Sequence, residues 1–169
     1  MEEEKSKPKW EGEASVELEG LRAEQVWPLL EDFCNLHKWL PTIDISYQVE
    51  GVPGKPGLIR YCSTTVPASS DGGDETTTVM YAKEQLTKID PIQRCLSYQV
   101  LENNVGIKWL VGTFQVLPVE GDEKCRCKIR WSFVADPPEG WKYDDMISYY
   151  DSSLRSMAKR MEEALISSA

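Results

Sequence analysis

The C-terminal stretch, residues 141–169, constrains the fold more than any other part of the sequence. It is the longest segment without proline or glycine, and its apolar residues recur every three or four positions. This spacing predicts one helix with a single apolar stripe, formed by Ile147, Tyr150, Leu154, Met157, Met161, Ala164 and Leu165. Such a helix would be roughly 40 Å long. It is too polar to cross a membrane, so it must bury its stripe against the rest of the chain.

The segments before this helix mostly alternate between apolar and polar residues, as β-strands do. Seven segments are expected to be strands: 10–18, 43–50, 58–66, 76–90, 94–102, 109–119 and 124–135. Two segments with helical spacing, 23–33 and 35–40, follow the first strand. Short turns between sequential strands favour an antiparallel meander. We therefore expect an α+β fold, in which a curved antiparallel sheet of about seven strands wraps around the C-terminal helix and leaves a cavity between them.

Length and charge limit the possible functions. The 169 residues suggest one domain, residues 10–169, after a disordered N-terminal tail, residues 1–9. The net charge of -9 argues against a nucleic-acid or anionic-membrane partner. The basic residues Arg126, Lys128 and Arg130 alternate along one strand, which predicts its solvated face. The first residues lack the apolar core of a signal peptide, and no apolar run is long enough to span a bilayer. We expect a cytoplasmic monomer.

The cysteines and the histidine predict neither a metal site nor a cofactor. Cys34, Cys62, Cys95, Cys125 and Cys127 are odd in number and form no CxxC pair, and the chain has one histidine. A zinc site needs four such ligands at suitable spacing. We interpret the cysteines as reduced thiols in the core of a protein from a reducing compartment. His37, on a short polar helix, is predicted to be a surface residue.

Two charged residues fall in the register of the predicted inward face. Arg60 alternates with Leu58 and Cys62, and Glu84 alternates with Met80, Ala82 and Leu86. A lone buried charge costs several kcal/mol, so such groups are usually paired. One interpretation is that Arg60 and Glu84 meet inside the cavity and act on a ligand. The alternative is that one or both lie near a strand end and reach solvent, as Lys88 on the same face as Glu84 must do.

The same register predicts the wall of the cavity. The expected lining residues are Cys62, Met80, Ala82, Tyr98, Trp131, Phe133, Tyr150, Leu154 and Met157. Residues 67–75 are rich in serine, glycine and aspartate, which is typical of a mobile loop, and we expect this loop to form a lid.

Several short sequence motifs, and their order along the chain, resemble those of the helix-grip superfamily. This superfamily includes birch-pollen-allergen-like proteins, START domains, polyketide cyclases and the plant abscisic acid receptors. Within it, the chain most resembles the onion lachrymatory factor synthase group and its plant relatives. The motifs include Glu24-Gln25-Val26-Trp27, Asn35-Leu36-His37-Lys38, Arg60-Tyr61, Ala82-Lys83-Glu84-Gln85-Leu86 and Trp131-Ser132-Phe133. The layout is also similar to that of the abscisic acid receptors, but their His-Arg-Leu latch has no counterpart in residues 104–108.

The resemblance to the synthases implies that Arg60 and Glu84 are the catalytic pair. The glutamate would move a proton, and the arginine would hold the oxygen of a sulfenic acid as it rearranges to a sulfine. Val100 and Leu110 also fall in the pocket by this resemblance, but at positions where the synthases carry tyrosines. The expected pocket is therefore more apolar than theirs and lacks those hydroxyl groups.

Three functional hypotheses follow. The first is the binding of a small hydrophobic plant metabolite or lipid in the cavity. The second is an enzyme, either a sulfenic-acid isomerase or a polyketide cyclase, that uses Arg60 and Glu84. The third is regulation of another protein through the lid loop.

Overall fold

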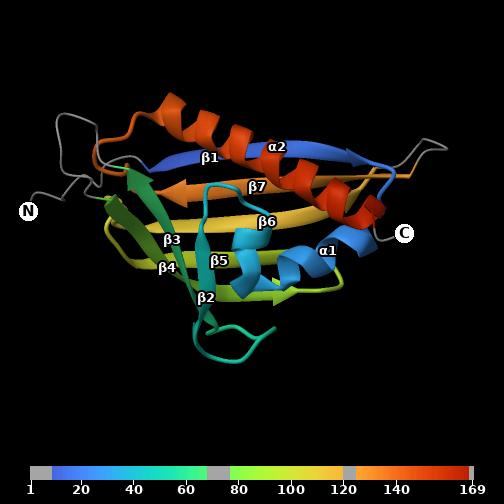
Figure 1. Cartoon of the computed structure of the whole chain (residues 1–169), viewed down its shortest axis with the longest axis horizontal. Coiled ribbons are helices and arrows are strands. Elements are labelled where there is room, and N and C mark those ends of the chain that lie inside the picture. Colours follow the sequence, from blue (N-terminus) through green and yellow to red (C-terminus); the bar gives the residue numbers. More distant parts are fainter. Residues whose placement is uncertain (1–8, 68–76, 120–124, 168–169) are drawn as a thin grey trace, which may run out of the picture.

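A seven-stranded antiparallel sheet curves around one long C-terminal helix (Figure 1). The computed structural model describes residues 9–67, 77–119 and 125–167. The elements in chain order are β1 (Trp10–Glu19), α1 (Ala23–Glu31), the 3-10 helix η1 (Phe33–Lys38), β2 (Ile45–Glu50), β3 (Ile59–Pro67), β4 (Thr77–Asp90), β5 (Cys95–Asn103), β6 (Leu110–Pro118), β7 (Arg126–Ala135) and α2 (Tyr143–Ser167). The strand order is β1-β7-β6-β5-β4-β3-β2, so all sequential strands after β2 are neighbours.

This architecture confirms the predicted fold class. The seven strands, the two short helices and the long helix all lie where the alternation and the helical spacing placed them, within a few residues. The proposed lid, residues 67–75, falls almost wholly outside the described residues, as do residues 1–8 of the proposed tail. Lys9, which the prediction assigned to that tail, is held in place: its Nζ lies 2.8 Å from Asp136 Oδ1 and 4.4 Å from the centre of the Trp109 ring.

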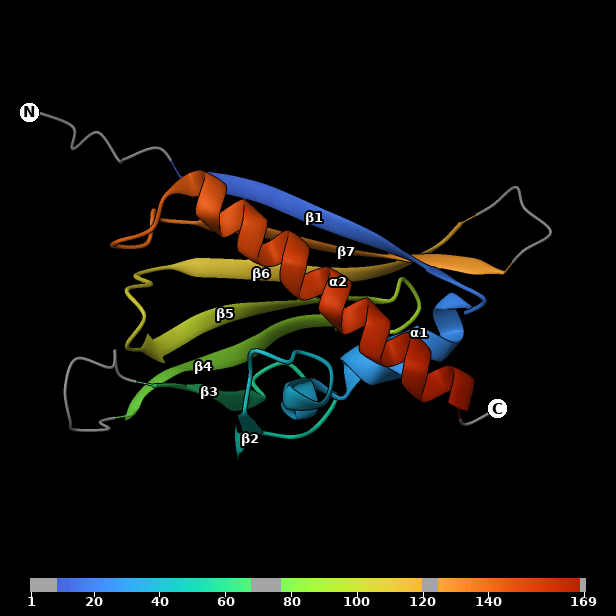
Figure 2. The same cartoon turned by 45° about the horizontal axis from the view of Figure 1, so that its top comes forward.

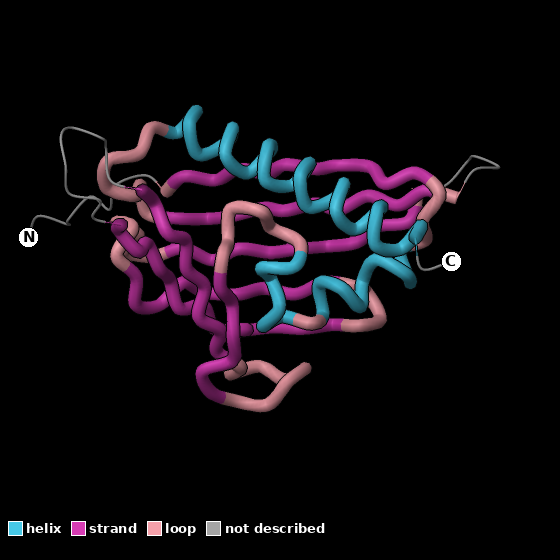
Figure 3. The backbone as a smooth tube through the Cα atoms, viewed as in Figure 1, coloured by secondary structure: helices cyan, strands magenta, loops and turns pink. Residues whose placement is uncertain are grey.

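Helix α2 crosses the concave face of the sheet diagonally, with α1 and η1 at one end (Figure 2, Figure 3). Its buried side chains include Met146, Tyr150, Leu154, Met157 and Met161. Burial of each such side chain stabilises the fold by about 1.5–3 kcal/mol. The helix approaches β1 closely at a glycine, because a Cβ on Gly12 would clash with Ile147 Cδ1 of α2 and would stand 2.8 Å from the Phe133 ring of β7. The predicted partner of the apolar stripe, the inward face of the sheet, is confirmed.

An extra residue in β4 explains the position of Lys88. Leu86 pairs with Tyr98 and Lys88 pairs with Ser97, so two steps along β4 match one step along β5. This bulge reverses the alternation beyond Leu86. Lys88 is therefore exposed, and Ile89 packs against the core instead. The expectation that Lys88 shares the inward face of Glu84 was wrong, because strict alternation cannot show an inserted residue.

The other polar predictions have mixed outcomes. The basic face of β7 is solvated and pairs with β1, as in the contact of Arg126 Nη1 with Glu17 Oε2 at 3.3 Å. The five cysteines are free thiols, and Cys62 and Cys127 are buried.

His37 is half-buried rather than a surface residue, and among the described residues its Nδ1 has no hydrogen-bond partner. In the part of the chain that the structure describes, no helix is long and apolar enough to span a membrane.

Candidate ligand-binding cavity

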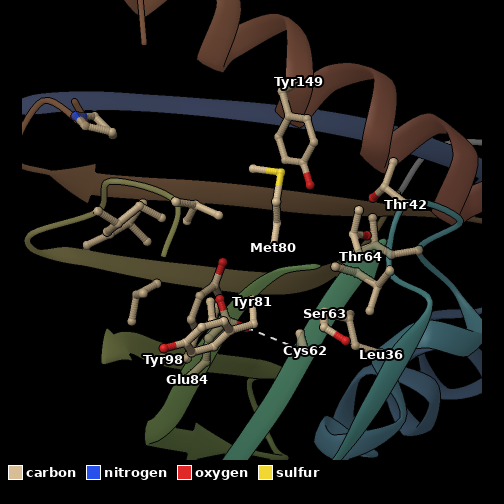
Figure 4. A pocket seen from close by; sticks show the side chains of 18 of the residues that line it. Leu36, Thr42, Cys62, Ser63, Thr64, Met80, Tyr81, Glu84, Tyr98 and Tyr149 are labelled. Carbon is tan, nitrogen blue, oxygen red and sulfur yellow. Dashed lines mark hydrogen bonds between the residues drawn. The ribbon is translucent and has the colours of Figure 1, made fainter. Parts of the chain in front are cut away.

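A cavity of about 380 Å³, partly open to solvent, lies between the sheet and the first turns of α2 (Figure 4). Strands β3, β4 and β5 form much of its wall, and η1, the loop before β2, the β5–β6 turn and the segment before α2 complete it. Its volume falls within the range of about 300–1,000 Å³ that is usual for small-molecule sites. The curvature of the sheet produces this space, since α2 lies close to β1 and further from β3 and β4 (Figure 2).

Most of the residues that the sequence assigned to the pocket line this cavity: Arg60, Cys62, Met80, Ala82, Glu84, Tyr98, Val100, Leu110, Trp131 and Tyr150. Phe133, Leu154 and Met157 do not line it. Leu154 and Met157 are fully buried further along α2, where the helix packs tightly on the sheet. Phe133 lies behind Tyr150, with the two ring centres 4.6 Å apart. The apolar stripe of α2 therefore divides into a short cavity wall and a longer solid core.

Arg60 and Glu84 form a buried ion pair at one end of the cavity. They are direct cross-strand neighbours on β3 and β4, so their side chains leave the sheet on the same face. Arg60 Nη2 lies 2.8 Å from Glu84 Oε1, and Arg60 Nε donates a hydrogen bond of 2.9 Å to the same oxygen. The side chains are 3% and 14% exposed, which does not fit the alternative in which they reach bulk solvent at a strand end.

The rest of the Arg60 side chain is also enclosed. Its Nη1 donates a 2.8 Å hydrogen bond to the carbonyl oxygen of Phe33, and its Cζ lies 3.8 Å from the centre of the Phe33 ring and 5.2 Å from that of Tyr98. Burial disfavours the guanidinium charge, but Glu84 and the other nearby ionisable groups outweigh this effect and raise the pKa of Arg60. Arg60 therefore stays charged and fixes the position of Glu84.

Cys62 is next to this pair but is not arranged as a nucleophile. Its Sγ is 3.7 Å from Ser46 Oγ and 3.9 Å from Glu84 Oε1. Burial raises the pKa of the Cys62 thiol to about 11, so the protonated form dominates at neutral pH. The thiolate is the reactive form of cysteine. Cys62 therefore forms part of the cavity wall and is not suited to covalent chemistry.

The phenol groups of Tyr98 and Tyr150, two of the residues predicted to line the cavity, lie next to one another. Trp131 Nε1 donates a 3.0 Å hydrogen bond to the hydroxyl oxygen of Tyr98, and the hydroxyl of Tyr150 lies beside it. The Trp131 and Tyr150 rings stack with their centres 4.1 Å apart. Burial raises the pKa of both tyrosines, so both phenols remain neutral. Tyr149 also lines the cavity, from the helix side (Figure 4). As expected, Val100 and Leu110 supply no hydroxyl groups, but the tyrosines that line the cavity do.

Loop residues also line the cavity, and no periodic pattern could have identified them. They include Thr42 and Ile43 before β2, Val105 and Ile107 in the β5–β6 turn, and Pro138 and Trp141 before α2. Asn103 shapes the turn, because its Oδ1 accepts hydrogen bonds from the backbone N–H groups of Val105 and Ile107 while its Nδ2 donates to Leu101 and Ile107 carbonyls. Its position before Asn104-Val105-Gly106 was the available signal, since asparagine commonly bonds nearby backbone in turns.

Solved structures with the same fold come from bacteria and from a plant. The protein XoxI from Bacillus cereus is 24% identical, with a TM-score of 0.68 over 92% of this chain and 95% of that one. An uncharacterised protein from Bacillus thuringiensis is 21% identical, with a TM-score of 0.65 over 93% and 99%. Ginseng major latex-like protein 151 from Panax ginseng is 20% identical, with a TM-score of 0.64 over 91% and 97%. At these identities the likeness establishes the helix-grip fold alone.

The sequence itself gives the finer assignment. Residues 9–165 match the family model described as polyketide cyclase / dehydrase and lipid transport. The match includes every strand, both short helices and nearly all of α2, and therefore the whole lining of the cavity. The chain belongs to the polyketide cyclase/dehydrase and lipid transport family.

Proposed function

We propose that the protein binds a small hydrophobic molecule in its internal cavity. The observation that carries this proposal is the cavity of about 380 Å³, walled largely by apolar side chains and containing one buried ion pair. Small-molecule sites typically combine an apolar wall with a few fixed polar groups, which orient the ligand. Membership of a family that includes lipid-transport proteins supports the same function.

The wall and the ion pair have different roles in this proposal. Val100, Leu110 and Trp131 would supply apolar contact area, at about 25 cal/mol per Å² of ligand and protein surface removed from water. Arg60 and Glu84 would fix the polar end of the ligand. Because Arg60 is held by three protein contacts, the polar groups are already in place before a ligand enters, which reduces the ordering cost of binding.

A neutral fluorescent probe, N-phenyl-1-naphthylamine, tests the proposal. We expect its fluorescence to rise on binding to the wild-type protein, and we expect Ala82→Phe, which adds a ring inside the cavity, to abolish this rise. Val49→Phe adds the same ring at a position on β2 that is 44% exposed, and should bind the probe normally. Incubation with a plant extract, repurification and mass spectrometry would then identify the retained molecule. Equal probe binding by the Ala82→Phe variant would contradict the proposal.

A second candidate function is favoured by the Arg60–Glu84 contact of 2.8 Å. A carboxylate held by a guanidinium inside a cavity is an arrangement that can transfer a proton while the cation balances charge on a nearby oxygen. The protein would then be an isomerase similar to the lachrymatory factor synthases, acting on a sulfenic acid, or a cyclase of polyketides. Glu84→Gln should retain the neutral probe but lose turnover. If the wild-type protein converts no member of a panel of sulfenic acids and polyketides, this candidate is excluded.

A further inference from the structure

One oxygen of the Glu84 carboxylate has no hydrogen-bond donor among the described residues. Both donors of Arg60 and the weaker contact of Cys62 converge on Oε1. Among the residues that the structure describes, no hydrogen-bond donor reaches Oε2. A carboxylate oxygen that is mostly buried needs a donor, which comes from water in an empty cavity and from the ligand in a filled one. The cavity therefore presents a free acceptor beside the ion pair.

The positive charge beside this oxygen is already used. Arg60 makes its two contacts with Glu84 and one with the Phe33 carbonyl oxygen, and aromatic rings lie against its guanidinium. The pair is close to neutral as a unit. The other described residues that line the cavity include no lysine, arginine or histidine. A negatively charged ligand group would thus approach Glu84 with no unpaired cation to receive it.

The tyrosines next to the pair leave at least one proton to donate. Trp131 donates to the Tyr98 oxygen, and the hydroxyls of Tyr98 and Tyr150 are adjacent to one another. Of their two phenol protons, at most one can be used in a bond between the two hydroxyls, and no other described residue accepts either. Glu84 and Tyr98 lie together at the end of the pocket away from Tyr149 (Figure 4). This end therefore offers one free acceptor and at least one free donor.

We infer that the end of the cavity at the Arg60–Glu84 pair selects a neutral ligand with a hydroxyl group and discriminates against carboxylates; this inference rests on the proposed binding function. A hydroxyl donates to Glu84 Oε2 and accepts from a phenol of Tyr98 or Tyr150, so it satisfies both groups at once. An ether or ketone can only accept and leaves the Glu84 oxygen without a donor. A carboxylate also only accepts, and in addition brings a second negative charge to Glu84.

The competing possibility is a cationic amine. It would donate to Glu84 Oε2, but it would also stand beside the guanidinium of Arg60, which already balances the carboxylate. Two cations against one anion in a site largely removed from water are unfavourable. The geometry thus favours the neutral hydroxyl over both charged alternatives, and the ranking is hydroxyl first, ether next and carboxylate last.

Matched sets of straight-chain alcohols, methyl ethers and carboxylates of equal chain length test the ranking. Each is used at neutral pH to displace N-phenyl-1-naphthylamine from the wild-type protein. We expect the alcohol to bind at least about tenfold more tightly than the carboxylate, because a carboxylate beside Glu84 Oε2 meets a like charge that the paired Arg60 offsets only in part. The ether should fall between them. A carboxylate that binds as tightly as the alcohol would overturn the inference, whereas absence of binding by the fluorescent probe itself would contradict the proposed function.

Two variants and one control test whether Glu84 and Tyr150 cause the preference for alcohols over carboxylates. Glu84→Gln removes the negative charge but keeps an acceptor for Arg60, so carboxylate binding should strengthen by about tenfold and the preference should shrink or invert. Tyr150→Phe removes one phenol proton and should weaken alcohol binding several-fold. Glu102→Gln removes a carboxylate that is 63% exposed and pairs with Lys83 outside the cavity, so it should keep the wild-type ranking. An unchanged ratio of alcohol to carboxylate affinity in Glu84→Gln, together with an unchanged alcohol affinity in Tyr150→Phe, would refute the inference.

Discussion

The ion pair of Arg60 and Glu84 should stabilise the protein much less than its geometry suggests, and a double-mutant cycle measures this. Arg60→Met removes both contacts with Glu84 Oε1 and the bond to the Phe33 carbonyl, and leaves a carboxylate that is 14% exposed without a cation. Glu84→Leu leaves the guanidinium of Arg60, 3% exposed, with Phe33 alone. Removal of one partner of a buried pair costs about 3–5 kcal/mol, because the other charge remains uncompensated. Each single variant should lose that amount.

The double variant should be far more stable than the sum of the two single losses predicts. Replacing a buried ion pair by apolar side chains of similar volume is close to neutral or even stabilising. We therefore expect Arg60→Met/Glu84→Leu to lie within about 2 kcal/mol of the wild type, where additivity would give a loss of about 6–10 kcal/mol. Equilibrium unfolding in urea supplies the free energies. Additive losses would refute the view that desolvation cancels the attraction between these two charges.

The exposed pair of Lys83 and Glu102 provides the matched control for this cycle. Its atoms are 3.4 Å apart and its side chains are 37% and 63% exposed; Lys83 is next to Glu84 on β4, and Glu102 is on β5. Surface ion pairs contribute about 0–1 kcal/mol. We expect Lys83→Met, Glu102→Leu and their combination each to change the free energy of unfolding by less than about 1 kcal/mol. A coupling energy as large as that of the buried pair would show that burial is not the cause.

Three further changes test other parts of the structure. Burial raises the pKa of the Cys62 thiol from 9.0 to about 11, so the native state keeps its proton to higher pH than the unfolded state. Cys62 should therefore contribute roughly 2–3 kcal/mol to the fall in the free energy of unfolding between about pH 9 and pH 11. The other buried thiols and tyrosines add to this fall, and Cys62→Ala should make it smaller by the contribution of Cys62. Gly112→Ala would place a Cβ 2.5 Å from the Tyr98 hydroxyl oxygen, so we expect a loss of about 1–3 kcal/mol from overpacking, and an unchanged melting temperature would contradict the packing argument. Arg94 has a φ of 52°, so Arg94→Gly should raise the melting temperature by about 1–4 °C. Arg94→Ala, which keeps the strain and loses only the 3.6 Å contact with Glu24, should not raise it.

Residue periodicity predicted the architecture because each element has one buried face. The alternation of β7 is complete: Cys127, Ile129, Trp131, Phe133 and Ala135 are all buried, and the residues between them are not. A strand of this kind can pair in one register without exposing its core face, so its sequence determines its placement. The same reasoning brought Arg60 and Glu84 to the inward face, and the cross-strand pairing then made them neighbours.

The features that the sequence did not predict are those that break periodicity. The extra residue between Leu86 and Lys88 reverses one half of β4, and no residue there, such as glycine or proline, marks the change. The division of α2 is a second case. Leu154 and Tyr150 belong to one apolar stripe, but the curvature of the sheet decides which of them contacts the sheet directly and which faces a void. Sheet curvature is a property of all the strands together and cannot be read from one helix.

The hydrogen-bonding groups at the polar end of the cavity also could not be predicted in full from single sequence positions. The resemblance to the synthases led to the expectation that two hydroxyls are missing at the positions of Val100 and Leu110. The fold supplies hydroxyls from Tyr98 on β5 and Tyr150 on α2, and Trp131 on β7 orients one of them with a 3.0 Å hydrogen bond. These residues come from three elements that are distant in the chain. Whether a pocket can bind a hydroxyl group depends on where its donors and acceptors meet in space. Comparison of single sequence positions does not show this arrangement and can therefore underestimate which ligands a pocket recognises.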